Sequence, residues 1–290
     1  MNETEELHQE ILSIFKYFKK ICEKYNFTYY AIGGTCIGAI RHKGFIPWDD
    51  DLDVAMPIKD YLKFREIAPM ELNDKYKLYD YMDEKNNKLN FLKLHNISTT
   101  FVEKEEYNYP QKYKGVFIDI MPVVGIPKNK FLQKLYLNKL LFLTKLDLNN
   151  RTPLKDKKTI IAKLQWIIIK PLISFKYDFY TKIIEKNWQK YGINNKNDVL
   201  FAWRIPLRKP YSNVFSYDFF SKTIDVKFED TTIAVPIKYD EYLKKDFGDY
   251  MKLPPIEKRV THKPYIFDLN KSFIDYAEKR RKELLDEQCS

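Results

Sequence analysis

The chain contains 290 residues, enough for one large domain or two small ones with an ample hydrophobic core. Charged residues make up 31% of it and aromatic residues 16%, which is typical of a globular protein and not of a disordered one. Its three cysteines are far apart, which argues against a disulfide framework or a zinc site and fits a reducing compartment. We identify neither a secretory signal nor an apolar run of the roughly 18 residues that a membrane span needs, and expect a cytoplasmic protein.

The net charge of +10 is concentrated in one segment. Residues 127–176 contain twelve lysines and arginines but only two acidic residues, so this segment carries the whole excess. A diffuse basic surface for nucleic acid would not confine the positive charge to one segment, and we therefore expect no nucleic-acid partner.

The N-terminal part predicts a helix over residues 4–25, from its apolar residues at helical spacing, and then a strand over residues 28–32. The glycines that follow predict a turn into a short helix that opens near Thr35. Gly33 and Gly34 let the backbone approach a ligand closely, and the free N–H groups of a helix start can hold phosphate. The short helix is followed by three basic residues that either contact phosphate or form a solvated helix end: Arg41, His42 and Lys43.

Four aspartates within five positions then predict a metal site. If residues 51–56 form a strand, Asp51 and Asp53 share one face, and Asp49 joins them if the extended chain starts earlier. Carboxylates about 5 Å apart repel each other by roughly 3–4 kcal/mol per pair at an effective dielectric constant near 20. A divalent cation removes this cost, and Mg²⁺, for which Mn²⁺ can substitute, prefers oxygen ligands. A solvated acidic loop is the alternative, but the apolar residues around the aspartates favour the metal.

After this strand we expect a helix from Pro57 to about residue 69, and extended chain over residues 76–102 in which His95 is structural or exposed rather than a ligand. The next strand, within residues 115–122, is short and apolar, and we expect it to stop at its proline.

Asp119 lies within this apolar strand, on the face opposite Val116, Ile118 and Ile120. A buried aspartate needs a partner, because an unpaired buried charge is very costly. The partner is either a lysine or the cation of the other aspartates, and we favour the cation.

The basic segment 127–176 alternates leucine-rich and lysine-rich stretches that predict helices. These helices either lie on an anionic membrane surface or pack on the core with their lysines reaching outward, and the local charge favours the membrane. Farther on, two runs in which apolar and polar residues alternate flank Glu229 and Asp230 and predict a hairpin that turns at this pair. A helix of about ten residues follows, and we expect it to end at Gly248.

Four stretches together resemble the LicD family, which is related to the fukutin group. They lie at residues 33–56, 115–127, 228–236 and 242–259, in the family's order, and the first is the most specific. Residues 127–200 match poorly. Phe247 stands where we expect a tyrosine of the family, a change that looks harmless.

The resemblance implies an α+β fold, with a nucleotidyltransferase-like mixed β-sheet flanked by helices and a basic helical insertion. Residues 1–126 would form the catalytic core, residues 127–200 the insertion, and residues 201–290 the strands and helices that complete the catalytic domain. Gly33, Gly34 and Thr35 would then hold the nucleotide phosphates. The metal ligands and catalytic carboxylates would be Asp51, Asp53 and Asp119, with Asp49 as a further ligand.

The resemblance also implies a reaction, the Mg²⁺-dependent transfer of phosphocholine, or a related phospho-alcohol such as ribitol phosphate, from a CDP-linked donor. CDP-choline is the favoured donor and CMP is released. The acceptor would be a sugar hydroxyl of a cell-surface glycan, free or lipid-linked: teichoic acid, capsule or lipopolysaccharide. The enzyme would then work in the cytoplasm, with residues 127–176 as a peripheral contact to the inner face of the cell membrane.

Two other functions fit parts of the sequence. A true nucleotidyltransferase would use the same carboxylates to attach a nucleoside monophosphate to a sugar, protein or RNA. A non-catalytic module would keep the fold and only bind a membrane surface or a polyanion. The aspartates favour an enzyme.

Overall fold

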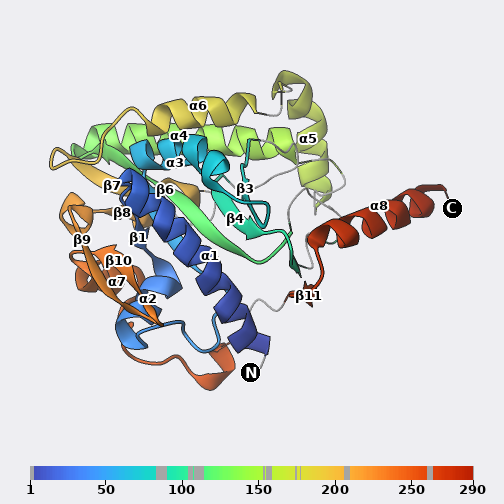
Figure 1. Cartoon of the computed structure of the whole chain (residues 1–290). Helices are drawn as coiled ribbons and strands as arrows, with labels where there is room; N and C mark the ends of the chain where they lie inside the picture. The colour runs from blue at the N-terminus through green and yellow to red at the C-terminus, as the bar shows by residue number, and fades with distance from the viewer. Residues whose placement is uncertain are drawn as a thin grey trace.

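The computed structural model describes residues 3–82, 90–103, 107, 114–152, 154, 159–173, 175–176, 178–205, 210–259 and 264–289. It shows a mixed sheet with helices packed against it and a last helix that projects from the body (Figure 1). The helices are α1 (Glu3–Tyr25), α2 (Gly33–Arg41), α3 (Ile58–Glu71), α4 (Lys130–Arg151), α5 (Ile160–Ile173), α6 (Phe179–Trp188), α7 (Tyr239–Phe247) and α8 (Phe273–Cys289).

Seven strands form the main sheet, and the long strand β6 is its centre. On one side β6 pairs in parallel with β2, which pairs antiparallel with β1. On its other side the first half of β6 pairs with β4, which pairs with β3, and the second half pairs with β7, which pairs with β8; these pairs are all antiparallel. The strands are β1 (Tyr30–Ala31), β2 (Asp53–Pro57), β3 (Tyr76–Tyr79), β4 (Leu92–Asn96), β6 (Phe117–Pro127), β7 (Asn197–Phe201) and β8 (Val214–Phe215). The predicted mixed sheet flanked by helices is confirmed.

Two smaller antiparallel pairs complete the fold. The predicted hairpin is β9 (Thr223–Phe228) with β10 (Thr231–Pro236), and β5 (Thr100–Val102) pairs with β11 (Ile266–Asp268). The turn of the hairpin packs on the loop after α2, where the Glu229 N–H donates to the Lys43 carbonyl at 2.8 Å. The C-terminal part of the chain thereby holds the glycine-rich region in place.

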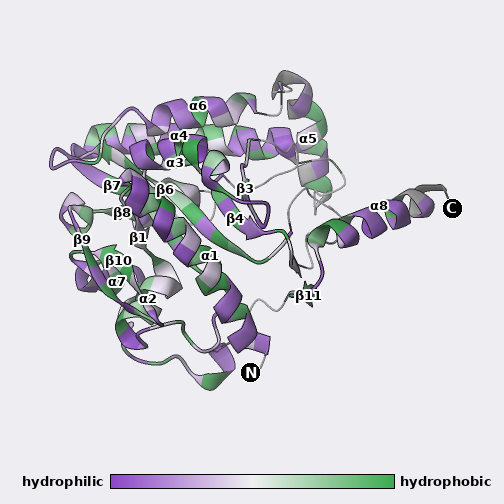
Figure 2. Cartoon of the chain, in the orientation of Figure 1, coloured by the Kyte–Doolittle hydropathy of each residue, from purple (hydrophilic) through white to green (hydrophobic). Residues whose placement is uncertain are grey.

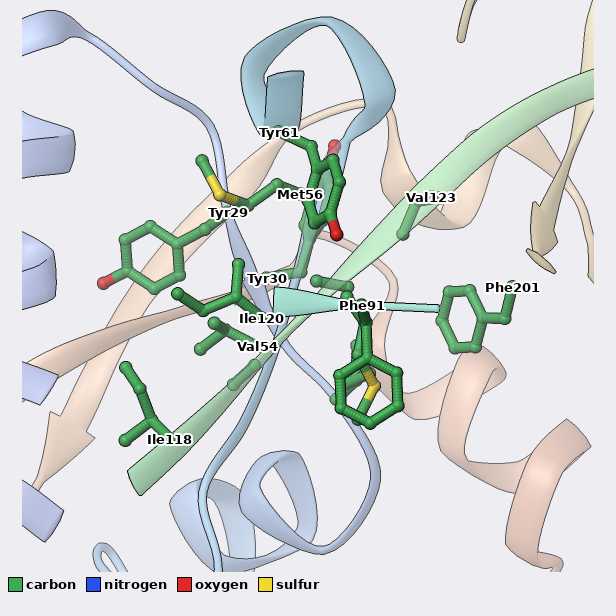
Figure 3. Close-up of a cluster of buried hydrophobic side chains, with 14 of the residues drawn as sticks. Tyr29, Tyr30, Val54, Met56, Tyr61, Phe91, Ile118, Ile120, Val123 and Phe201 are labelled. Carbon is green, nitrogen blue, oxygen red and sulfur yellow. The ribbon is translucent and has the colours of Figure 1, made fainter. Parts of the chain in front are cut away.

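The hydrophobic core lies between the sheet and the helices that cover it. The predicted N-terminal helix is confirmed as α1, which buries Ile11, Phe15 and Phe18. Figure 3 shows Val54 of β2 beside Ile118 and Ile120 of β6, and all three side chains are fully buried.

Three predicted boundaries are wrong. The acidic strand begins at Asp53 and not at Asp51. The helix after it runs two residues past Pro69, to Glu71. Strand β6 does not stop at Pro122 but continues to Pro127. The proline is tolerated because it falls between Ile120, the last residue that pairs with β4, and Val123, the first that pairs with β7.

The helices predicted in the basic segment are present as α4 and α5. Helix α4 packs on the body through Tyr136, Leu137 and Leu140. Within the described part of the chain, no helix has both the length and the apolar character that crossing a membrane requires.

Of the two roles expected for His95, structural or exposed, its surroundings support the structural one. The ring is buried, and Nδ1–H donates to the Gly115 carbonyl at 2.8 Å. Burial lowers the pKa of His95 to about 3, because the charged imidazolium would lose its hydration.

We therefore predict a pH dependence of stability that His95→Gln removes. The pKa of His95 is about 3 in the folded chain, and about 6.5 is usual for an unfolded one. Between these values the unfolded chain binds the extra proton, so the free energy of unfolding falls as the pH falls. Between pH 7 and pH 5 this one residue should cost about 2 kcal/mol.

Urea unfolding at the two pH values tests this. Glutamine keeps a hydrogen-bond donor but does not titrate, so the His95→Gln variant should lose about 2 kcal/mol less than the wild type on acidification. Equal losses in both proteins would contradict the assignment.

Candidate active site

The parallel pairing of β2 with β6 places two carboxylates side by side. Asp53 and Asp119 are partners in the ladder, and the Asp119 N–H donates to the Leu52 carbonyl at 3.0 Å. Partners in a parallel ladder point to the same face of the sheet, on strands roughly 5 Å apart. Their neighbours Val54 and Ile120 point to the opposite face, into the core.

Three further aspartates gather in the loop before β2. Asp49, Asp50 and Asp51 each offer a carboxylate oxygen, and these oxygens all lie within 4.8 Å of one another. Asp50 was not predicted as a ligand, because alternation along a strand would point it away from Asp49 and Asp51. The strand begins only at Asp53, so the loop is free to turn three consecutive carboxylates together. His8 of α1 fixes this loop by donating Nε2–H to the Asp49 carbonyl at 2.6 Å.

The pKa of Asp53 is raised by its burial and by three of the neighbouring aspartates. Burial is the first cause that raises its pKa well above the usual range, and the negative charges of Asp51, Asp119 and Asp49 raise it further. Lys93 acts in the opposite direction and lowers it. The site therefore concentrates negative charge in a poorly hydrated place, where a cation is strongly favoured.

The glycine turn at the start of α2 lies against the same carboxylates. A Cβ atom on Gly34 would lie 2.5 Å from Asp49 Oδ2, and one on Gly33 would lie 3.5 Å from Asp53 Oδ2. Gly33 also has a φ of +56°, which favours glycine. The absence of side chains on these glycines thus lets the acidic loop approach the positive end of the helix.

The backbone N–H groups in the first turn of α2 differ in their availability for a phosphate. The Gly33 N–H donates to the Tyr242 hydroxyl of α7 at 3.0 Å, so it is not available for phosphate in this arrangement. Gly34 and Thr35 come next in the first turn, where the helix itself provides no acceptor for their N–H groups. The Thr35 hydroxyl accepts from the Asp53 N–H at 2.8 Å and links the helix start to β2.

Lys93 of β4 is a site residue that the sequence analysis did not identify. It is the ladder partner of Asp119, and its ammonium lies 3.0 Å from Asp119 Oδ1 and 3.5 Å from the centre of the Phe117 ring. Of the two partners that the sequence allowed for Asp119, the structure shows the lysine. Apolar and polar residues alternate along β4, which indicates that Lys93 points away from the core. Only the pairing of β4 with β6 shows that Lys93 meets Asp119.

The predicted basic triplet lies at the other end of α2. Eight residues separate Gly33 from Arg41, which is about 12 Å along the helix axis. Arg41 Nη1 donates to the Tyr250 carbonyl at 2.5 Å, and burial followed by the charge of Arg259 lowers the pKa of Arg41.

The other two residues of the triplet also contact their surroundings. The His42 ring packs edge-on against Trp48, and burial lowers its pKa. Lys43 is exposed at its side chain, while its carbonyl binds the turn of the β9–β10 hairpin. In this arrangement Arg41 and Lys43 bind other loops at the far end of α2, whereas the carboxylates meet the glycine turn at its start.

Comparison with known proteins confirms the resemblance. Residues 26–140, which include the glycine turn, the aspartates, Lys93 and Asp119, match the family model described as LicD/FKTN/FKRP, nucleotidyltransferase domain. The lipopolysaccharide cholinephosphotransferase LicD of Haemophilus influenzae is 29% identical over 261 residues, which cover 87% of this chain and 92% of that protein. Uncharacterized proteins of Rickettsia typhi and Rickettsia prowazekii are 38% and 36% identical over 64 residues, 21% of this chain.

The glycines of α2 give a prediction about stability. A Cβ atom on Gly38 would lie 2.5 Å from the backbone oxygen of Gly44, which cannot move without the loop, whereas the Asp49 carboxylate near Gly34 can rotate away. We expect Gly38→Ala to lower the free energy of unfolding by about 1–3 kcal/mol. Gly34→Ala should change it by less than about 1 kcal/mol, since alanine also favours the helix. Urea unfolding of both variants measures the difference, and equal losses would refute it.

Proposed function

Because the chain carries a LicD-family domain, we propose that it is a phosphotransferase that moves phosphocholine from a CDP-linked donor, CDP-choline first, to a sugar hydroxyl, with release of CMP. The acceptor we propose is a cell-surface glycan, and the name of the Haemophilus relative favours lipopolysaccharide over teichoic acid or capsule. The observation that carries the proposal is the meeting of the Asp53–Asp119 pair with the acidic loop and the glycine turn.

We further propose that the fold is nucleotidyltransferase-like. The supporting features are the mixed sheet, the glycine turn between β1 and α2, and carboxylates contributed by two neighbouring parallel strands. The description of the matching family model points the same way.

The donor set fits Mg²⁺ or Mn²⁺. Asp51, Asp53 and Asp119 would hold the ion with Asp49, and Asp50 adds a carboxylate to the same loop. Hard cations of this kind prefer carboxylate oxygens and leave positions open for phosphates. When bound, the ion would neutralise charge on the donor phosphates.

The residues of the chain divide the remaining work. The Gly34 and Thr35 N–H groups, at the positive end of α2, would bind a phosphate of the donor. Asp119 would accept the proton of the attacking sugar hydroxyl as its oxygen bonds to the phosphorus of phosphocholine, and the bond from that phosphorus to CMP breaks. Lys93 would orient Asp119 by the contact at 3.0 Å. Positioning and charge supply most of the rate in such transfers.

A true nucleotidyltransferase is the second candidate, favoured by the wording of the family model. It would release pyrophosphate from a nucleoside triphosphate, whereas the proposed enzyme releases CMP from CDP-choline. A non-catalytic module gains little support, because half-buried and buried carboxylates that repel one another would only lower its stability.

Asp53→Asn should reduce CMP release from CDP-choline at least about 100-fold, because it removes a central carboxylate of the site. The variant should unfold at the wild-type temperature or above it, since the substitution removes a carboxylate whose pKa is raised by burial and by repulsion from its neighbours. Asp225→Asn, an exposed position on β9, is the matched control and should remain active. Near-normal turnover of Asp53→Asn would refute the site, and pyrophosphate release from CTP by the wild type would favour the second candidate.

Lys93→Met keeps most of the side-chain volume but removes the ammonium beside Asp119. We expect slower CMP release and a lower melting temperature, with partial recovery of both in Lys93→Arg. Mg²⁺ should raise the melting temperature of Lys93→Met more than that of the wild type, because the ion replaces the missing positive charge. Identical Mg²⁺ shifts in the two proteins would contradict this role.

A further inference from the structure

Helix α5 presents large apolar side chains to solvent. Ile160, Ile161, Leu164, Ile167 and Ile168 are 78%, 69%, 56%, 53% and 70% exposed. At 100° per residue these five positions fall within an arc of about 120° on the helix. We call them the α5 stripe. Figure 2 shows hydrophobic residues along α5 at the edge of the molecule.

The opposite side of α5 attaches it to the body. Trp166 Nε1–H donates to the Thr152 carbonyl at 2.9 Å, and the Lys170 ammonium donates to the Asn150 carbonyl at 2.5 Å. Trp166 lies about 160°, and Lys170 about 120°, around the helix from the centre of the stripe. An ordinary surface helix buries its apolar face, whereas α5 exposes the apolar side chains of the stripe.

Helix α4, which packs against α5, also exposes apolar side chains. Although its inner face is buried, Phe131, Leu135 and Phe142 are 70%, 53% and 61% exposed. Large apolar side chains that share one exposed helix face, as in the α5 stripe, mark a contact with a partner, because water covers them only at a cost in free energy.

The positive charge near the stripe favours an anionic partner. Of the two acidic residues between 127 and 176, Asp147 is buried against Arg151, and Asp156 lies outside the described residues. Lys163 is exposed beside the stripe on α5, and the neighbouring helix α4 exposes Lys134, Lys139 and Lys145. A second copy of the chain would bring like charges together, whereas an anionic lipid surface attracts the lysines and accepts the isoleucines.

We propose that the α5 stripe docks the protein on an anionic lipid bilayer, with α5 lying in the plane of the surface. The isoleucines enter the boundary between headgroups and acyl chains, and Lys163, beside the stripe, stays at the headgroups. This inference rests on exposure and charge and is independent of the proposed reaction.

Co-sedimentation of the full chain with vesicles tests the proposal. The wild type should bind phosphatidylglycerol vesicles more tightly than phosphatidylcholine vesicles, and salt should weaken the binding. The double variant Ile160→Gln/Ile168→Gln should bind phosphatidylglycerol vesicles at least about tenfold more weakly, because two apolar side chains no longer enter the lipid.

Met70→Gln/Ile256→Gln is the matched control, since those side chains are 76% and 77% exposed elsewhere on the surface. It should bind like the wild type, and both variants should melt at the wild-type temperature. The proposal is overturned if the wild type does not bind phosphatidylglycerol vesicles, or if the two double variants bind these vesicles equally well. A wild-type dimer that Ile160→Gln/Ile168→Gln dissociates, without a difference in vesicle binding, would assign the stripe to a second copy and equally overturn it.

Discussion

The register between β2 and β6 is the constraint on which the candidate site depends. Val54 and Ile120 point into the core from one face of the two strands, and Asp53 and Asp119 therefore emerge together on the other. A slip of one residue would bury the carboxylates and expose the apolar side chains, so burial of the core fixes the register. The geometry of the acidic site is thus maintained by apolar packing on the opposite face of the sheet.

The structure also shows how the chain accommodates so much negative charge. Lys93 reaches Asp119 from β4, the Asp49 carboxylate lies against the start of α2, and Thr35 ties that helix start to β2. These contacts are incomplete compensation, because burial and neighbouring charges still raise the pKa of Asp53. The remaining imbalance is the physical reason to expect a divalent cation and donor phosphates at this place.

The sequence was most informative where the determinants are local. Glycines before a short helix, and aspartates beside a buried strand, reveal the turn and the acidic cluster because neighbouring residues create both. Distant pairings were not predictable: Lys93 meets Asp119 only because β4 and β6 pair, and Tyr242 reaches Gly33 across 209 positions. Pro122 misled the strand prediction, since the rule that proline ends a strand ignores a central strand that changes partners. Asp50 was missed because alternation was applied to a loop.

The acidic site and the basic segment with its apolar stripe lie in different parts of the fold, and separate experiments test them. Crystals of the full chain grown with Mn²⁺ test most directly whether the acidic site binds a cation, through the anomalous signal of the metal. We predict a peak within coordinating distance of the Asp53 and Asp119 carboxylates, beside the first turn of α2. A peak elsewhere, or no peak while Asp119 remains paired with Lys93, would contradict the account.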